Sequence, residues 1–134
     1  MKHLAIYCGT DITSVERIKE SIHEFGDTFL KRIYTEQEIA YCESRKVSKY
    51  QSYAARFAAK EAAYKALSTQ IDGMISWQDV EVTRNENGKP YLKFHGELEK
   101  VANRLGIQEG NVDISLSHDT AYAVATVVIE NKEN

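Results

Sequence analysis

The 134-residue sequence predicts an α+β fold. Segments with the two-residue period of strands and segments with the 3.6-residue period of helices are mixed, but they do not alternate strictly. Asn87-Gly88 is a strong signal for a hairpin between two strands. An alanine-rich stretch over residues 51–69 contains neither glycine nor proline, which favours one long helix.

The chain is predicted to begin with a buried strand and an amphipathic helix. Residues 3–8 form an apolar run that Gly9 closes. Thr13 and Glu16 have the spacing of a capping box, which marks the start of a helix. Gly26 is a stop signal, and the apolar residues before it recur at helical intervals: Val15, Ile18, Ile22 and Phe25.

Two further helices are predicted before the hairpin. Thr35 and Glu38 repeat the capping-box spacing and introduce a short helix. Residues 44–49 form a polar, basic connection, and a solvated loop is the simplest interpretation of it. The long helix over 51–69 follows and ends before Gly73.

The remainder is predicted to contain the hairpin, a short helix and a closing pair of strands. Pro90, the only proline, directs the chain into the second hairpin strand. Gly106 stops a helix with one apolar face. The predicted elements are strands over 77–83 and 91–95, a helix over 98–105, and strands over 112–117 and 122–129.

Composition sets limits on the class of protein. The length suits one domain, residues 1–134, with one hydrophobic core. The net charge of −3 argues against a nucleic-acid-binding protein. No apolar stretch approaches the roughly 20 residues of a membrane span, so a cytoplasmic protein without a membrane partner is expected. Cys8 and Cys42 match no zinc spacing and are expected to be reduced and structural.

Two places carry side chains suited to catalysis, and each also has a structural explanation. Phe57, Glu61 and Lys65 lie four residues apart and share one helix face. Glu61 and Lys65 also stand in the favourable order for a helical salt bridge. Asp11 follows the first strand, where a carboxylate either favours a helix N-terminus or binds a hard cation such as magnesium.

Two short segments are less specific. Ser117-His118-Asp119 cannot form a hydrolase triad, because triad members converge from separate segments. An ordinary structural role is the alternative to a functional role for His118. Lys89 lies in the predicted turn, where it is also placed to meet a phosphate.

Taken in order, these pieces resemble the phosphopantetheinyl transferase superfamily, and within it the short, single-domain acyl-carrier-protein synthase branch. The resemblance spans the chain, and the central helix motif is its most specific part. The segments that carry it are Gly9-Thr10-Asp11-Ile12 with Arg17, 56–62 with Lys65-Ala66, 77–82, Asn87-Gly88-Lys89-Pro90, and 115–119 with Tyr122-Ala123.

The resemblance implies that the fold is a mainly antiparallel sheet packed with a long central helix. It implies a metal site in which Asp11 and Glu61 hold Mg²⁺ beside phosphate oxygens of coenzyme A and water. It gives Lys65 a contact with the pyrophosphate. The chemistry of the reaction adds a second role for Glu61, which is to help deprotonate the attacking serine directly or through a bound water, while the identity of the general base stays open. The resemblance assigns the nucleotide end of coenzyme A to Lys89, Pro90, Ser117 and His118, and the 3′-phosphate to Arg45, Lys49 and Arg56.

The implied reaction moves 4′-phosphopantetheine from coenzyme A to a serine of apo acyl carrier protein, in support of fatty acid biosynthesis. Adenosine 3′,5′-bisphosphate leaves, so negative charge must be neutralised by a cation and a lysine. The resemblance also implies a homotrimer with active sites at the subunit boundaries. The acidic carrier is expected to dock through Arg17, Lys31 and Arg32, although acidic residues dilute this basic patch: Glu16, Glu20, Glu24 and Asp27.

Three alternative functions stay open at this point. A protein that only binds coenzyme A would have no need for the metal pair. A broad-range transferase for peptide or polyketide carriers is usually a longer, two-lobed chain. A metal-dependent phosphohydrolase would use the same carboxylates and release phosphate without a carrier.

Overall fold

The computed structural model describes residues 4–132, and it confirms the predicted α+β class. His3, at the start of the predicted first strand, lies outside this range. Short 3₁₀ turns occur at Lys46–Ser48, Ser68–Gln70, Trp77–Asp79 and Glu109–Asn111. The main elements are β1 (Leu4–Ser14), α1 (Val15–Phe25), α2 (Asp27–Ile33), α3 (Glu36–Ser44), α4 (Lys49–Leu67), β2 (Val80–Arg84), β3 (Pro90–Phe94), α5 (Gly96–Leu105), β4 (Val112–His118) and β5 (Tyr122–Lys132).

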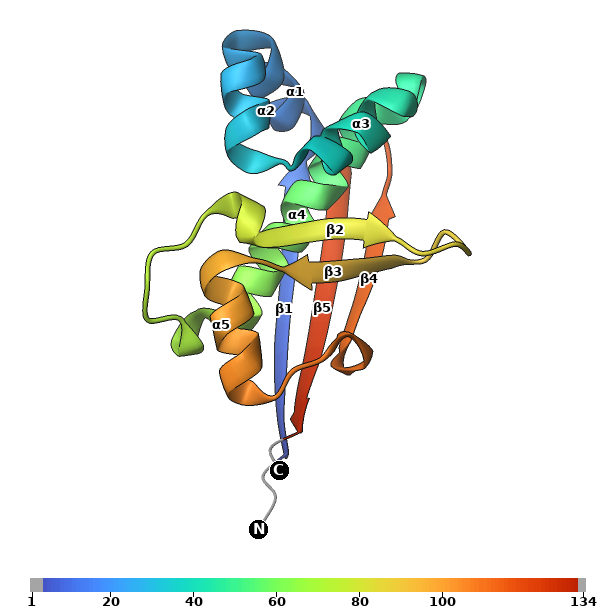
Figure 1. The fold of residues 1–134 in the computed structure, drawn as a ribbon. Coiled ribbons are helices and arrows are strands. Elements are labelled where there is room, and N and C mark those ends of the chain that lie inside the picture. Colours follow the sequence, from blue (N-terminus) through green and yellow to red (C-terminus); the bar gives the residue numbers. More distant parts are fainter. Residues whose placement is uncertain (1–3, 133–134) are drawn as a thin grey trace.

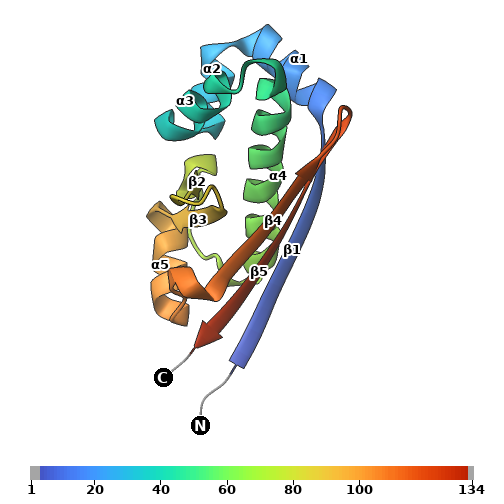
Figure 2. The ribbon, with the colours of Figure 1, turned by 90° about the vertical axis from the view of Figure 1, so that its right-hand side faces the viewer.

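Helix α4 is the centre of the molecule. On one side it packs against a three-stranded antiparallel sheet of order β1-β5-β4, and on the other it contacts β2 of the separate β2–β3 hairpin. Figure 2 shows these layers, with the sheet, α4 and the hairpin with α5 following one another. In Figure 1, α1 and α2 lie above the β1 side of the sheet, whereas α3 and the hairpin turn extend toward the β4 side. The predicted central helix is therefore confirmed.

Small residues let α4 approach the sheet closely. Ala58, Ala59, Ala62 and Ala63 are fully buried in its inner faces. Gly9 on β1 meets this surface, and a Cβ atom there would lie 1.9 Å from the carbonyl oxygen of Ala62. Any side chain at position 9 would push β1, and Asp11 with it, away from α4.

A buried ion pair fastens α4 to the other layer. Nζ of Lys60 lies 2.8 Å from Oε1 of Glu38 on α3, and neither side chain is exposed. Lys60 also donates to the carbonyl groups of Trp77 and Val80. Oε2 of Glu38 accepts from the backbone N–H of Val82, 2.7 Å away. Both charges are thus hydrogen-bonded, as burial requires.

Several helix and turn boundaries match the prediction because their signals are local. Thr35 and Glu38 form the predicted capping box at the start of α3. Gly26 and Gly106 end α1 and α5 with positive φ angles of 55° and 71°. The hairpin turn contains Gly88 with φ of 79°. These positive φ values strongly favour glycine.

Other boundaries were predicted wrongly. Strand β1 continues past Gly9 to Ser14, and Ser14 rather than Thr13 caps α1 by accepting from the N–H of Arg17. The basic 44–49 connection contains a 3₁₀ turn, and α4 spans Lys49–Leu67 rather than 51–69. Trp77 lies in a 3₁₀ turn before β2, not in the strand. Helix α2 was not predicted at all.

The face of the sheet that points away from α4 carries exposed apolar side chains. Alternate residues of β1 and β5 lie there, including Leu4, Ile6, Ile12, Val124 and Val128, and Ile6 is 67% exposed. Cys8 shares this face and is exposed, whereas Cys42 is buried. Burial raises the pKa of the Cys42 thiol to about 12. Among residues 4–132 there is no helix with the length and apolarity to cross a membrane.

Candidate active site

Asp11 is placed by β1 on the side of the sheet that faces α4. It lies opposite Ala125 of β5, a fully buried residue, and directly paired residues of an antiparallel sheet point to the same face. Oδ2 of Asp11 accepts from the Thr13 hydroxyl at 2.7 Å. Oδ1 lies 3.0 Å from Nζ of Lys65, which also donates to the carbonyl of Thr10. Strand β1 and α4 therefore meet through an ion pair at this point.

Glu61 lies on α4 one turn before Lys65 and lines the same cavity as Asp11. This cavity of about 390 Å³ also has Arg17, Phe29 and Phe57 in its wall. Burial, together with the negative charge of Asp11, raises the pKa of Glu61, and Lys65 opposes the shift. Two carboxylates from separate segments thus converge on one partly desolvated space, and a cation there would relieve their repulsion.

The donor set suits magnesium. Magnesium binds a few carboxylates and keeps several positions for water and substrate phosphate oxygens. Within residues 4–132, His, Cys, Asp and Glu side chains nowhere gather in threes as a potential metal site. Asp11 and Glu61 would therefore leave most of a magnesium ion open to phosphate, which is the arrangement that a phosphate-transferring site needs.

Aromatic side chains cover the solvent side of α4 next to Glu61. Trp77 stacks on Phe57 with ring centroids 5.0 Å apart, and its ring meets Tyr64 edge to face at 5.8 Å. Phe57 and Tyr64 flank Glu61 along the same helix face. The sequence did not suggest a place for Trp77 in the site, since its alternation with later apolar residues was attributed to a strand.

A second constellation surrounds Tyr41 of α3. Arg56 of α4 is only 2% exposed, and its guanidinium carbon lies 4.1 Å from the centroid of the Tyr41 ring. Its Nε has no hydrogen-bond partner within residues 4–132. The guanidinium carbons of Arg84 and Arg45 lie 5.0 and 5.7 Å from the same centroid. Arg56, Arg84 and Tyr41 line a cavity of about 200 Å³.

This arginine cluster is suited to an anion. No acidic side chain is paired with Arg45, Arg56 or Arg84 among the ion pairs of the described residues. A buried guanidinium without a carboxylate is costly unless a ligand supplies the negative charge. The sequence pointed to Arg45 and Arg56, but it missed Tyr41 and Arg84. Their convergence depends on α3 and β2 packing at the same end of α4.

The other predicted nucleotide-binding residues lie on the β4 side. Lys89 and Pro90 line a cavity of about 510 Å³ between the hairpin and the turn that precedes β4. Nζ of Lys89 lies 3.4 Å from Oδ1 of Asp113. Ser117 and His118 are exposed at the end of β4. Lys49 is directed differently, because its Nζ binds Glu43 at 3.2 Å and lies over the ring of Tyr50.

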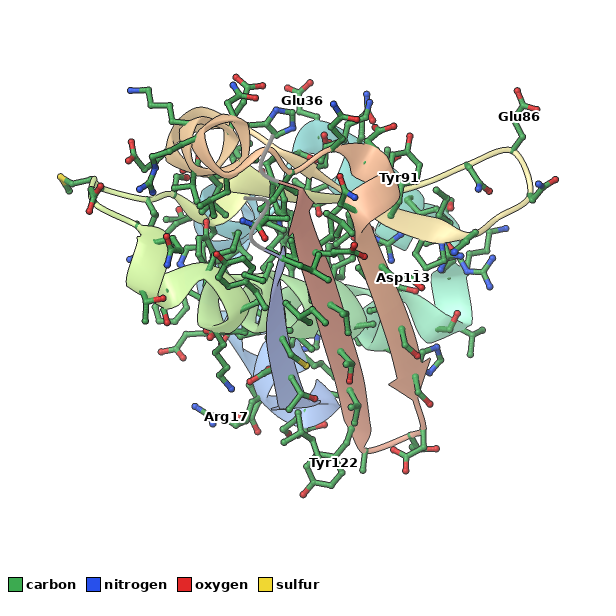
Figure 3. The ribbon with its side chains drawn as sticks, turned by 90° about the horizontal axis from the view of Figure 1, so that it is seen from below. Arg17, Glu36, Glu86, Tyr91, Asp113 and Tyr122 are labelled. Carbon is green, nitrogen blue, oxygen red and sulfur yellow. The ribbon has the colours of Figure 1, made fainter. Side chains whose placement is uncertain are left out.

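The predicted site residues therefore form two groups. The cavity with Asp11 and Glu61 contains none of the predicted nucleotide-binding residues, and the cavities lined by Arg56 and by Lys89 contain neither Asp11 nor Glu61. Strand β5 separates the two edge strands, β1 and β4. Figure 3 shows Arg17 on the β1 side and Tyr91, Asp113 and Glu86 on the β4 side.

The predicted docking residues lie close to the first group. Arg17 is exposed and lines the cavity of Asp11 and Glu61. Lys31 and Arg32 are exposed in the last turn of α2. Glu16, Glu20 and Glu24 are also exposed, at four-residue spacing along α1. The acidic dilution of the basic patch that the sequence indicated is thus present on the surface of α1.

Comparison with known proteins identifies the family. Residues 7–127 match the family model of the 4′-phosphopantetheinyl transferase superfamily. The chain is 49% identical over 123 residues to the holo-[acyl-carrier-protein] synthase of Koribacter versatilis, with 92% of this chain and 96% of that protein covered. The corresponding synthase of Solibacter usitatus is 47% identical with the same coverage.

A solved structure agrees with this result. The crystal structure of the Helicobacter pylori holo-[acyl-carrier-protein] synthase in complex with coenzyme A has a TM-score of 0.76 and 31% sequence identity, and covers 91% of this chain and 98% of that chain. The resemblance found in the sequence is confirmed, and so is the enzyme class. The chain belongs to the holo-[acyl-carrier-protein] synthase family of the 4′-phosphopantetheinyl transferase superfamily.

Proposed function

We propose that this chain transfers 4′-phosphopantetheine from coenzyme A to a serine of apo acyl carrier protein, with Mg²⁺ held between Asp11 and Glu61. The reaction is the one that its family membership gives. The observation that carries the site assignment is the shared cavity of Asp11 and Glu61, with Lys65 bonded to Asp11. Two carboxylates and an exposed lysine meet here on the strand and the helix that carry the motifs of the family resemblance.

The side chains divide the chemistry between them. The serine oxygen of the carrier forms a bond to the β-phosphorus, and the bond from that phosphorus to the leaving adenosine 3′,5′-bisphosphate breaks. Lys65 is half-exposed, so its ammonium can turn from Asp11 to the pyrophosphate and offset the charge of the leaving group. Magnesium, when bound, adds further positive charge at the phosphate oxygens. Glu61 helps to remove the proton of the serine hydroxyl, directly or through water.

The nucleotide end of coenzyme A is proposed to bind the second group of residues. The 3′-phosphate would occupy the cavity at Arg56, which is buried and has no acidic partner in the part of the chain that the structure describes. Arg45 lies beside the same tyrosine and adds positive charge. Lys89 and Pro90, with Ser117 and His118, would contact the rest of the nucleotide. Lys49 is the weakest member of this set, because Glu43 already neutralises it.

A homotrimer is proposed because one coenzyme A molecule must reach both groups. A neighbouring copy that brings its β4 side to the β1 side of the first would complete the site. Such a contact joins two different surfaces, so it does not form a simple two-fold pair, and it generates a closed ring when its rotation brings the last copy back to the first. The exposed apolar face of the sheet, which includes Leu4, Ile6 and Val128, would supply the buried area. The family resemblance gives three as the number of copies.

The carrier is proposed to dock at the rim of the Asp11–Glu61 cavity. Arg17 lies in this rim, and Lys31 and Arg32 extend the positive surface along α2. Because three glutamates of α1 lie nearby, long-range attraction of an acidic carrier depends on few cations. A cytoplasmic location stays a prediction from the sequence.

Intact mass spectrometry tests the function directly. Incubation of an apo carrier with coenzyme A, magnesium and the protein should increase the carrier mass by one phosphopantetheine group. Chelation of the metal, or the variants Asp11→Asn and Glu61→Gln, should prevent the increase. A coenzyme A-binding protein would give no mass change. A phosphohydrolase would instead release phosphate without a carrier, and either result would overturn the proposal.

A further inference from the structure

Helix α2 is short and depends on few attachments. Its seven residues follow Gly26, whose positive φ turns the chain sharply after α1. Its main contacts are with α1 and with the 3₁₀ turn Trp77–Asp79. A helix of this length has little stability of its own in water, because nucleation costs more than a few hydrogen bonds return. The position of α2 therefore depends on the packing of Phe29, Leu30 and Ile33 against the core and on the contacts at its ends.

At the C-terminal end of α2, where Ile33 and Tyr34 are buried and Tyr34 donates to the carbonyl of Tyr53, one distant side chain adds hydrogen bonds to the backbone. Nε2 of Gln78 donates to the carbonyl oxygen of Lys31 at 2.6 Å and to that of Tyr34 at 2.8 Å. Both acceptors are carbonyls, so only the amide nitrogen of Gln78 can face them. The contacts join residues 47 and 44 positions apart in the sequence.

The two carbonyl groups have lost the partners that a continuing helix would give them. The N–H of Thr35 donates to Oε1 of Glu38 at 2.9 Å, and the N–H of Glu38 donates to Oγ1 of Thr35 at 3.2 Å. These are the amides four residues after Lys31 and Tyr34, and the α3 capping box uses both. Gln78 satisfies the carbonyls that this capping leaves open.

Gln78 itself is fixed next to the catalytic cavity. Ser76 and Asp79 cap its turn by mutual side-chain to backbone hydrogen bonds. Trp77, the preceding residue, stacks on Phe57, which lines the cavity of Glu61. Helix α2 in turn contributes Phe29 to that cavity. The turn thus connects the wall beside Glu61 with the helix that carries Lys31 and Arg32.

We infer that Gln78 is a positioning residue for the carrier protein, because its amide holds α2 in the orientation that places Phe29 in the wall of the cavity and exposes Lys31 and Arg32 on the same helix. The role in carrier binding rests on the proposed function. The attachment of α2 by Gln78 does not, since it follows from the hydrogen bonds alone. Nothing in this role requires contact between Gln78 and either substrate.

The variant Gln78→Met tests the inference, because it keeps the length of the side chain and removes both N–H donors. Hydrogen exchange measured over residues 27–34 should become faster by roughly tenfold, since the two lost hydrogen bonds stabilise only the local structure. The apparent KM for an apo carrier should rise by a similar factor of about ten, while the KM for coenzyme A stays unchanged. Exchange in α5 serves as the internal reference.

Two further variants separate positioning from general damage. Gln78→Lys restores N–H donors of suitable reach and should recover slow exchange in α2 and a low carrier KM. Gln70→Met removes an amide whose one side-chain hydrogen bond within the described residues goes to the neighbouring Thr69 hydroxyl, and it should change neither the exchange rate of α2 nor the carrier KM. Thermal unfolding of all variants checks that the fold is kept.

The outcomes distinguish the inference from the function beneath it. Unchanged exchange over residues 27–34 in Gln78→Met would refute the attachment of α2 by Gln78. Faster exchange with an unchanged carrier KM would refute α2 as the docking helix, and with it that part of the proposed function. Equal increases of both KM values, or no recovery in Gln78→Lys, would show a general loss of structure and overturn the positioning role.

Discussion

Replacement of Glu61 by glutamine separates metal binding from folding, because it should lower the rate of transfer but raise the stability of the metal-free protein. The amide keeps the size of the side chain but cannot carry the negative charge that magnesium needs. Transfer of phosphopantetheine should fall on the order of 10²-fold or more, because loss of a charged ligand costs about 3 kcal/mol of transition-state stabilisation in such sites. Asp11→Ala and Glu61→Ala should abolish transfer in the same way, without unfolding the protein.

Stability should change in the other direction. Burial and Asp11 raise the pKa of Glu61, so its ionisation destabilises the metal-free folded state. This cost is absent below the ordinary pKa of 4.5 and develops as the pH rises above it. Glu61→Gln removes the cost. The variant should therefore gain thermal stability relative to the metal-free wild type at pH 7, and the gain should be smaller at pH 4.

Magnesium should reverse the order of stability of the wild type and Glu61→Gln. At a concentration tenfold above Kd, binding stabilises the wild type by about 1.4 kcal/mol. For 134 residues, with an unfolding entropy of about 2.1 cal/mol/K per residue, the midpoint should rise by roughly 5 °C. The midpoint of Glu61→Gln should barely move. Scanning calorimetry with magnesium or chelator measures both quantities, and an equal magnesium shift in the two proteins would refute the metal assignment.

Three further predictions address the nucleotide, the carrier and the assembly. Arg56→Lys should raise the KM for coenzyme A by about tenfold, which corresponds to the loss of one charge-assisted hydrogen bond, and should leave the KM for 3′-dephospho-coenzyme A unchanged. Equal effects on both ligands would exclude a 3′-phosphate site at Arg56. Arg17→Ala should raise the apparent KM for the carrier with little change in the KM for coenzyme A, whereas Glu24→Lys should lower the carrier KM, and both effects should shrink at moderate salt. An unchanged carrier KM and an unchanged salt dependence in Arg17→Ala would show that α1 is not the docking face. Ile6→Lys should convert a trimer into inactive monomers in sedimentation experiments, while the control Met74→Lys, at a 96% exposed loop position, should leave the trimer intact. A stable, active wild-type monomer would contradict an active site shared between subunits.

Local chemistry is what the sequence could predict. A capping box such as Thr35 with Glu38 requires only residues three apart, and a glycine stop such as Gly106 requires only its own backbone freedom. The hairpin at Asn87-Gly88 and the alanine-rich helix are signals of the same kind. The most specific part of the family resemblance lies on α4, where the spacing of Phe57, Glu61 and Lys65 fixes a shared face.

The errors have one physical cause, which is that distant partners decided the outcome. Thr13 has the right spacing to cap α1, but β5 pairs with β1 as far as Ser14 and keeps Thr13 in the strand. Trp77 alternates like a strand residue, yet its stacking on Phe57 and the caps of its turn hold it in a 3₁₀ conformation. Helix α2 starts at Gly26 without a side-chain cap, and the carbonyls at its other end are satisfied by Gln78 from a distant part of the chain.

The site was divided in the same way between sequence and tertiary structure. The sequence predicted which side chains would carry charge for the proposed reaction, since Asp11, Glu61 and Lys65 lie in the local motifs that carry the family resemblance. Only the tertiary structure brought Asp11 on β1 to Glu61 on α4 and gathered Arg84 and Tyr41 around Arg56. It also put the two groups of residues toward different edges of the sheet, at β1 and at β4. Spacing along a chain fixes which face of a helix or strand a residue occupies, but the packing of elements far apart in the sequence decides which faces meet.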